Sequence, residues 1–174
     1  MIKKIDKIIV CISGGISSVT YLSFIGIMLI ISVDVTLRKV FRSSIPGSYE
    51  LVERMLLLLV FAGFAYTQAI RGHIHVTLFI RLFPKFIRMA LFGFLGLLST
   101  VTATFCGYAV WLQANHSVSS RTVTAVLNIP LYPFFYVASL CMYAFAFTLL
   151  WDTIKSFMGI VNNEIAEDIQ SAWN

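Results

Sequence analysis

The sequence predicts an all-α integral membrane protein with four transmembrane helices and an interfacial amphipathic helix between the second and the third. Of its 174 residues, 59% are hydrophobic and only 12% are charged, whereas roughly 25% of the residues in soluble domains are charged. Four apolar runs reach the ~20 residues that a helix needs to cross ~30 Å of hydrocarbon. These runs are continuous, whereas the strands of a membrane barrel alternate apolar and polar positions. We therefore expect a single membrane domain over residues 1–174.

The first crossing is predicted over about residues 8–37. It is preceded by a cationic start with Lys3, Lys4 and Lys7. Such a start is also typical of a cleavable signal peptide, but this apolar run is too long for one and ends without a small-x-small cleavage site. We therefore expect an uncleaved helix whose N-terminus lies in the cytoplasm.

A short polar stretch, Arg38 to Leu51, joins the first crossing to the second, which is predicted over about residues 49–70. Pro46 and Gly47 supply the turn signal in this stretch. Glu50 then falls in the first helical turn, where a carboxylate suits the positive end of the helix dipole.

An interfacial segment is predicted over about residues 76–85. Cations recur there and just beyond it at i, i+4 and i+7 beside phenylalanine and leucine, a pattern typical of a helix lying at the membrane surface. The third and fourth crossings are predicted over about residues 86–114 and 130–157. The residues that we expect to anchor the chain at the lipid interface are Arg81, Lys85, Arg88, Trp111 and Trp151.

The distribution of cations predicts the topology. With the N-terminus inside, eight cations fall on the inner side and five on the outer side, which favours cytoplasmic N- and C-termini. The inner set is Lys3, Lys4, Lys7, Arg71, Arg81, Lys85, Arg88 and Lys155, and the outer set is Arg38, Lys39, Arg42, Arg54 and Arg121.

Composition and motifs exclude several function classes. The formal net charge is +5, but the basic residues flank apolar runs, where lipid headgroups account for them, so we expect no nucleic-acid partner. The three cysteines are isolated within apolar runs, which favours buried small side chains over a disulfide or redox pair. The sequence contains no serine triad, intramembrane zinc-protease motif, phosphate loop or pair of catalytic carboxylates, so we do not expect an enzyme.

The histidines predict no metal site and no cofactor. His73, His75 and His116 lie at the ends of their segments. A haem held by two histidines would require them well inside facing helices. We therefore expect these side chains to have interfacial or packing roles.

Four charges near the joining stretch form a predicted cluster: Asp34, Arg38, Glu50 and Arg54. Asp34 and Arg38 are spaced i, i+4, as are Glu50 and Arg54, and each pair can form a local ion pair on a helix. The favoured interpretation is a structural cluster that holds the first two helices in register, with contact to a partner subunit or ion coupling as alternatives. The helix centres are nearly free of ionisable residues, which a transporter working alone would need. The pattern indicates a scaffold.

Three stretches resemble one transporter family. They are Arg38-x-x-Phe41 with Ile45 to Leu51 (I-P-G-S-Y-E-L), Arg71 to Val76 (R-G-H-I-H-V), and Leu127-x-Ile129-Pro130. In this order and with this four-crossing layout, they resemble the small membrane subunit of the tripartite ATP-independent periplasmic (TRAP) transporters. The sequence departs from the family pattern at Thr77, where an acidic residue is frequent, and at Val137 to Leu140, where Pro-Gly is expected. These departures leave the subfamily and the substrate open.

The resemblance implies a role in a three-component importer of the bacterial inner membrane. A periplasmic binding protein would capture a sialic acid, a C4-dicarboxylate or a similar carboxylate and dock transiently. A large membrane subunit would bind sodium and move the substrate by an elevator motion, while this chain, embedded in membrane lipid, would belong to the stationary frame. The surface expected to face the periplasm near the docked protein carries Arg38, Arg42, Glu50 and Arg121. The competing interpretations are a membrane-anchor subunit of a haem or quinone redox complex and a small autonomous exporter.

Overall fold

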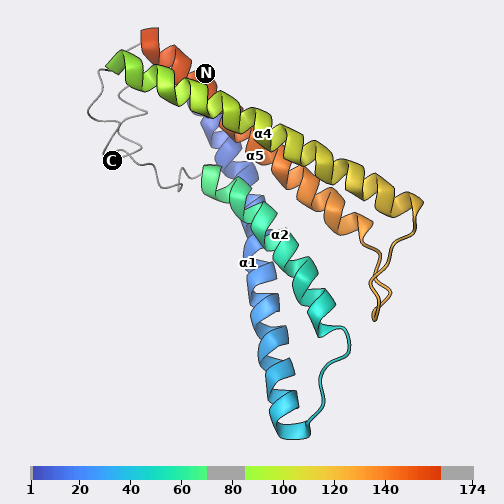
Figure 1. Cartoon of the computed structure of the whole chain (residues 1–174). Helices are drawn as coiled ribbons and strands as arrows, with labels where there is room; N and C mark the ends of the chain where they lie inside the picture. The colour runs from blue at the N-terminus through green and yellow to red at the C-terminus, as the bar shows by residue number, and fades with distance from the viewer. Residues whose placement is uncertain (1, 70–84, 162–174) are drawn as a thin grey trace.

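A computed structural model describes residues 2–69 and 85–161 of the chain, and within them it is helical. The elements are α1 (Ile2–Phe41), α2 (Ser48–Ala69), α4 (Lys85–Ser119) and α5 (Tyr132–Val161) (Figure 1). Outside the helices, the described part contains one isolated antiparallel bridge, between Val123 and Pro130. The all-α prediction is confirmed for these residues, whereas the predicted interfacial segment at 76–85 lies almost wholly outside them.

Three of the helices are longer than the apolar patterns predicted. Helix α1 covers Ile2–Phe41 instead of 8–37, α4 continues to Ser119 instead of 114, and α5 ends at Val161 instead of 157. Hydropathy marks only the part of a helix that suits hydrocarbon, whereas backbone hydrogen bonding continues into polar flanks. At the end of α1, Arg38 and Lys39 extend the helix because cations suit the negative end of its dipole.

Three of the described helices are long and apolar enough to cross a membrane. The spans are Gly14–Phe41, Gly93–Ser119 and Tyr132–Met158. Helix α2 has 22 residues, close to the predicted 49–70, and its role as a fourth crossing stays a prediction.

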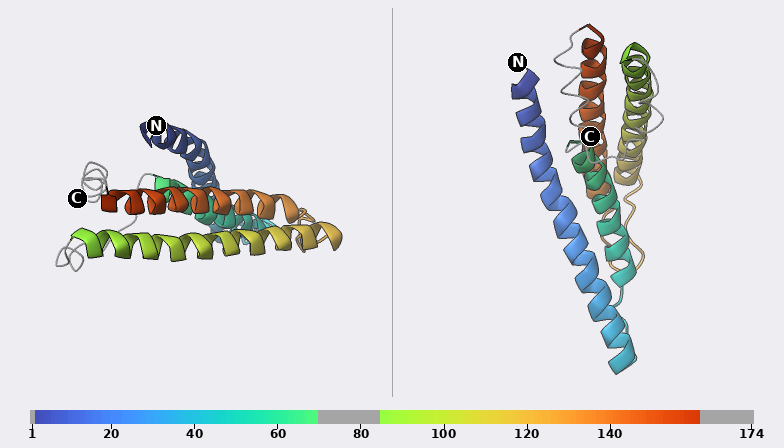
Figure 2. Two further views of the ribbon diagram at one scale, coloured as in Figure 1. Left: turned by 90° about the horizontal axis from the view of Figure 1, so that it is seen from above. Right: turned by 90° about the vertical axis from the view of Figure 1, so that its left-hand side faces the viewer.

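The helices form an open row in the order α1, α2, α5, α4. The main packing contacts in the described part join α1 to α2, α2 to α5, and α4 to α5. The row therefore consists of two antiparallel hairpins that meet through α2 and α5 (Figure 2). Figure 1 shows the two hairpins crossing near the start of the chain and diverging toward their loops.

Small residues line the contact between α4 and α5. On α4 they recur at alternate spacings of three and four residues, and a larger side chain, Val110, takes one position of the series. The small residues are Gly93, Gly96, Thr100, Ala103, Gly107, Ala114 and Ser117. This is the spacing of a coiled-coil seam, and small side chains let membrane helices approach closely. The approach is close enough for the hydroxyl of Ser139 to donate to the backbone carbonyl of Gly107 at 3.0 Å.

Little of the apolar surface of the described helices is covered by other described residues. The buried core cluster consists of Ala103, Met142 and Ala146, with Phe61, Phe145 and Leu149 packed around it. In the apolar window of α1 only 11% of the residues are buried, and in that of α4 only 17%. In water such faces would drive association, so these helices require lipid or other membrane helices around them.

Candidate functional site

In the part of the chain that the structure describes, polar contacts concentrate where two loops meet, residues 42–47 after α1 and residues 120–131 after α4. We call this region the loop junction. The first of these loops is a tight turn in which the amide of Ser48 donates to the carbonyl of Ile45 at 3.2 Å. Gly47 adopts a φ of 76°, in the left-handed region where a residue without Cβ carries no steric penalty. The Pro-Gly signal therefore marks a real reversal between α1 and α2.

Asp34 ties the end of α1 to this turn. Its side chain is buried and accepts a hydrogen bond from the amide of Ile45 at 2.8 Å through Oδ1. Through Oδ2 it pairs with Nη2 of Arg38 at 2.7 Å. Because a buried charge is costly unless it is paired and hydrogen-bonded, these two contacts explain how a carboxylate lies seven residues inside the helix.

Glu50 ties the start of α2 to the second loop. Its two carboxylate oxygens accept hydrogen bonds from the backbone amides of Val126 and Leu127 at 2.8 and 3.0 Å. The donors lie in the loop between α4 and α5, which Figure 1 shows beside the start of α2. The contact thus joins the two hairpins at their loop ends, where the helices themselves diverge.

The second loop has its own internal hydrogen bonds. The amide of Thr124 donates to the carbonyl of Ile129 at 3.0 Å, and the amide of Leu131 donates to the carbonyl of Thr122 at 3.2 Å. The hydroxyl of Thr124 also accepts a hydrogen bond from the amide of Ile129 at 3.0 Å. A loop held in this way can present two neighbouring amides to a single carboxylate.

The predicted four-charge cluster is divided in the structure. Asp34 and Arg38 form the expected ion pair, but Arg54 pairs with Glu53 at 3.1 Å instead of with Glu50. The predicted Glu50–Arg54 pair is not formed among the described residues, where Glu50 is turned to the amides of the second loop and Arg54 to Glu53. Nε of Arg54 is buried and has no hydrogen-bond partner in the part of the chain that the structure describes.

Three of the four residues predicted for a partner surface are exposed. Arg38, Arg42 and Arg121 lie at the surface of the loop junction, whereas Glu50 is half-buried and engaged with the second loop. Arg42 and Arg121 have φ values of 51° and 49°, a backbone conformation common just after a helix end. They mark the points at which the chain leaves α1 and α4.

The predicted interface anchors are only partly described. Trp111 is exposed near the loop end of α4 and contacts Tyr136 edge-on, with ring centroids 5.0 Å apart. Trp151 is half-buried toward the other end of α5, with Nζ of Lys155 5.6 Å from its ring centroid. Arg81 lies outside the described residues. Lys85 and Arg88 stand in the first turns of α4, and their side chains also lie outside the described part.

No metal or catalytic constellation is found in residues 2–69 and 85–161. Among the described residues, no three of His, Cys, Asp and Glu lie close enough to hold a metal. His116 is exposed near the end of α4, and His73 and His75 fall outside the description. Cys106 is exposed and Cys141 is buried, and both are free thiols.

A second polar link between the hairpins was not predicted from the sequence. Nε2 of Gln68, near the end of α2, donates to Oδ2 of Asp152 on α5 at 2.8 Å. A signal existed, because each is a polar residue in an otherwise apolar stretch. Only the packing of α2 on α5 pairs two residues that are 84 positions apart in sequence.

The family model described as "Tripartite ATP-independent periplasmic transporters, DctQ component" matches residues 27–159. The matched range includes both loops of the loop junction and more than half of the chain. No curated protein matches the sequence.

Proposed function

Because the chain belongs to the DctQ component family of the tripartite ATP-independent periplasmic transporters, we propose that it is the stationary scaffold of a sodium-coupled importer of organic acids. Members of this family are small membrane subunits that work with a large membrane subunit and a substrate-binding protein. The observation that carries the proposal is the family match over residues 27–159. The bacterial inner membrane is the proposed location.

The open row of helices supports the scaffold role. An elevator mechanism requires a frame that stays fixed while the carrier slides along it. A row of long helices with broad, largely uncovered apolar faces can lie against a larger membrane protein and widen its fixed frame. The loop junction joins the two hairpins at the start of α2, and the Gln68–Asp152 contact joins them near its end.

The placement of charges supports substrate and sodium sites on the large subunit. From Gly14 to Val33 in α1, and from Tyr132 to Trp151 in α5, the sequence has no Asp, Glu, Lys or Arg. Intramembrane ionisable residues are the usual marks of substrate and ion pathways. This chain therefore contributes position and stability, and the carboxylate-binding groups belong to its partner.

With both termini in the cytoplasm, as the cation count favours, the loop junction faces the periplasm. Arg42 and Arg121 then lie where the binding protein docks, and complementary charge across such a contact speeds encounter. We expect Arg42→Glu and Arg121→Glu to raise the concentration of binding protein needed for half-maximal uptake, with the membrane complex intact. Ser44→Ala, at another exposed position of the same loop, is the neutral control. Unchanged uptake in both charge-reversal variants would remove the docking role.

The interfacial cations have a proposed role on the opposite side. Arg81, Lys85 and Arg88 are expected to contact anionic lipid at the cytoplasmic surface, where each cation contributes about 1 kcal/mol. Replacement of all three with Gln should reduce the stability of the complex in anionic bilayers or its transport. Assembly and uptake equal to those of the unchanged protein would contradict this role.

Reconstitution tests the proposed function as a whole. Proteoliposomes with this chain, the large subunit and the loaded binding protein should take up substrate in a sodium gradient, and those lacking either membrane subunit should not. Replacement of sodium with choline should abolish uptake. Uptake by the large subunit alone at the full rate would refute the scaffold role, and a Soret band in the purified chain would favour the redox alternative.

A further inference from the structure

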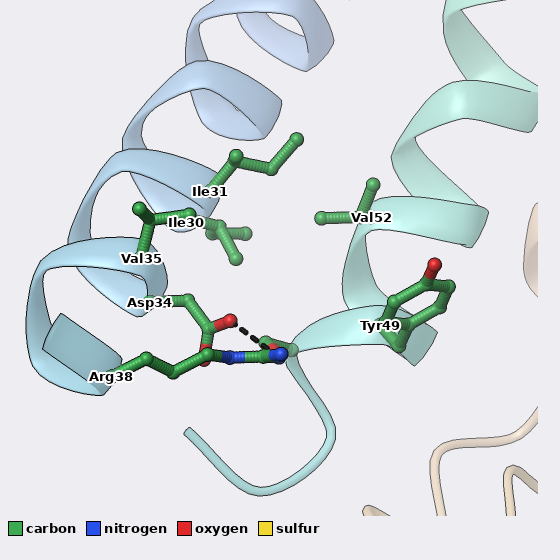
Figure 3. Close-up of a pocket in the computed structure, with 8 residues that line it drawn as sticks. Ile30, Ile31, Asp34, Val35, Arg38, Tyr49 and Val52 are labelled. Atoms are coloured by element: carbon green, nitrogen blue, oxygen red, sulfur yellow. Dashed lines mark ion pairs between the residues drawn. The ribbon is translucent and has the colours of Figure 1, made fainter. Parts of the chain in front are cut away.

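A cavity of about 340 Å³ lies between the last turns of α1 and the start of α2 (Figure 3). We call it the α1–α2 groove. Its volume is within the ~300–1,000 Å³ of ligand-binding pockets. The groove is lined by side chains of both helices and adjoins the Asp34–Arg38 ion pair, but none of its lining residues belongs to the second loop.

The polarity of the groove changes along its length. Ile30 and Ile31 on α1 lie across from Val52 on α2 and form its apolar end (Figure 3). Asp34 and Arg38 form its polar end and lie about a turn or two farther along α1. At 1.5 Å rise per residue, the two ends are centred about 8 Å apart along α1. An occupant must therefore be apolar on one side and polar on the other.

The direction of this change fits a membrane. The groove occupies the last turns of the apolar span Gly14–Phe41, and Arg38 and Lys39 are in its final helical turn. Cations at the end of a transmembrane helix lie at the level of the lipid headgroups. The polar end of the groove thus lies at headgroup level and the apolar end lies deeper, toward the hydrocarbon.

The charges around the polar end favour an anion. Both oxygens of Asp34 are engaged, one by the amide of Ile45 and one by Arg38. The side chain of Arg38 remains 53% exposed, and its guanidinium has five N–H donors, so donors remain for a second acceptor. Lys39 and Arg42, close to Arg38 in the sequence, are also exposed, so this end of α1 is rich in cations.

We propose that the α1–α2 groove binds an anionic phospholipid, with its phosphate on the guanidinium of Arg38 and an acyl chain against Ile30, Ile31 and Val52. A lipid satisfies both ends of the groove, because its headgroup and its acyl chain have the required order of polarity. A bound lipid would fill the space between α1 and α2 just above the loop junction. The inference does not depend on the scaffold role, and it concerns the membrane leaflet opposite to the one proposed for the interfacial cations.

Native mass spectrometry of the full chain, purified and delipidated with and without the large subunit, tests the proposal. Dioleoyl phosphatidylglycerol is titrated, and the bound lipids per chain are counted. Val35→Phe fills the groove, and Val33→Phe is its matched control, because the two valines are equally exposed on α1 and only Val35 lines the groove. Arg38→Gln removes the cation, and Arg121→Gln removes one that does not line the groove.

The expected result is one tightly bound phosphatidylglycerol per chain. Val35→Phe should abolish its binding, and Arg38→Gln should weaken it about fivefold, the equivalent of about 1 kcal/mol for one cation at a membrane surface. Val33→Phe and Arg121→Gln should leave it unchanged. A photoreactive acyl chain should cross-link to peptides that contain Ile30 to Val35.

Three outcomes would overturn the proposal. One is equal lipid binding by Val35→Phe and Val33→Phe. This comparison does not use Arg38→Gln, so it decides the question even if that variant unfolds. Another is equal affinity for dioleoyl phosphatidylcholine, which would leave the cations without a role. The third is loss of the bound lipid when the large subunit joins, with a cross-link from position 35 to that subunit, because the occupant would then be a protein side chain.

Discussion

Gly47 is the position at which a single methyl group should disturb the loop junction most. A Cβ at this residue would lie 2.7 and 2.9 Å from the two methyl carbons of Leu127, and closer still to its Cγ. The φ of 76° adds backbone strain for any residue with a Cβ. Gly47→Ala therefore combines two costs at one site.

Both costs have known magnitudes. The left-handed conformation costs an L-residue about 1–2 kcal/mol, and overpacking of a well-packed site costs about 1–3 kcal/mol. Leu127 cannot retreat freely, because its amide donates to Glu50 at 3.0 Å. We expect Gly47→Ala to lower the free energy of unfolding by about 2–5 kcal/mol.

The assay is equilibrium unfolding of the full chain in mixed micelles. Gly63→Ala is the control, because a Cβ there would meet only Cγ2 of Thr20 at 3.9 Å, and alanine is favoured by up to about 1 kcal/mol over glycine in a helix. Leu127→Ala removes the three atoms that lie nearest to the added Cβ, so in that background Gly47→Ala should cost mainly the backbone strain of about 1–2 kcal/mol. An equal cost in both backgrounds, or a loss below about 1 kcal/mol in the unchanged chain, would refute the reasoning.

Two further predictions concern the contacts between helices and loops. Glu50→Gln should speed hydrogen exchange at the loop amides from which Glu50 accepts, because a neutral oxygen is the weaker acceptor. Glu53→Gln, on the exposed side of α2, should leave their exchange unchanged. Equal protection of these amides in both variants would contradict the proposed link. Gly96→Val should weaken the α4–α5 contact by about 1–3 kcal/mol, because its Cβ would collide with Oγ1 of Thr153. Gly14→Val, where nothing lies within 4 Å, serves as its control in unfolding measurements, and an equal loss in the two variants would count against a close α4–α5 approach.

The helices could be predicted because their signal is local. A continuous apolar run of this length indicates a helix without any knowledge of the rest of the chain. Each of the four predicted crossings corresponds to a helix in the described part. The helix ends were less accurate, because α1 continues through Arg38 and Lys39 to Phe41. Charged side chains at a helix terminus do not stop backbone hydrogen bonding.

The ion pair of Asp34 with Arg38 was predicted, but the other partners of Asp34 and Glu50 could not be predicted because they are backbone groups. Asp34 accepts from the amide of Ile45, and Glu50 accepts from the amides of Val126 and Leu127. Every residue except proline has an amide, so no sequence pattern distinguishes these donors. The i, i+4 spacing predicted Arg54 as a local partner for Glu50, but Glu50 instead accepts hydrogen bonds from the distant loop amides.

The seam of small residues on α4 is visible in the sequence as an alternation of spacings of three and four from Gly93 to Ser117. That spacing predicts which face of α4 a neighbouring helix covers.

The link from Glu50 to Val126 imposes an order in time on the making of this protein. The two residues are 76 positions apart, and chains grow from the N-terminus at about 5–20 residues per second. Glu50 is therefore made about 4–15 s before the amides that it accepts from. During that interval the carboxylate has no loop amides to accept from and must remain in water or at the lipid headgroups, and the Gln68–Asp152 contact can form only later still.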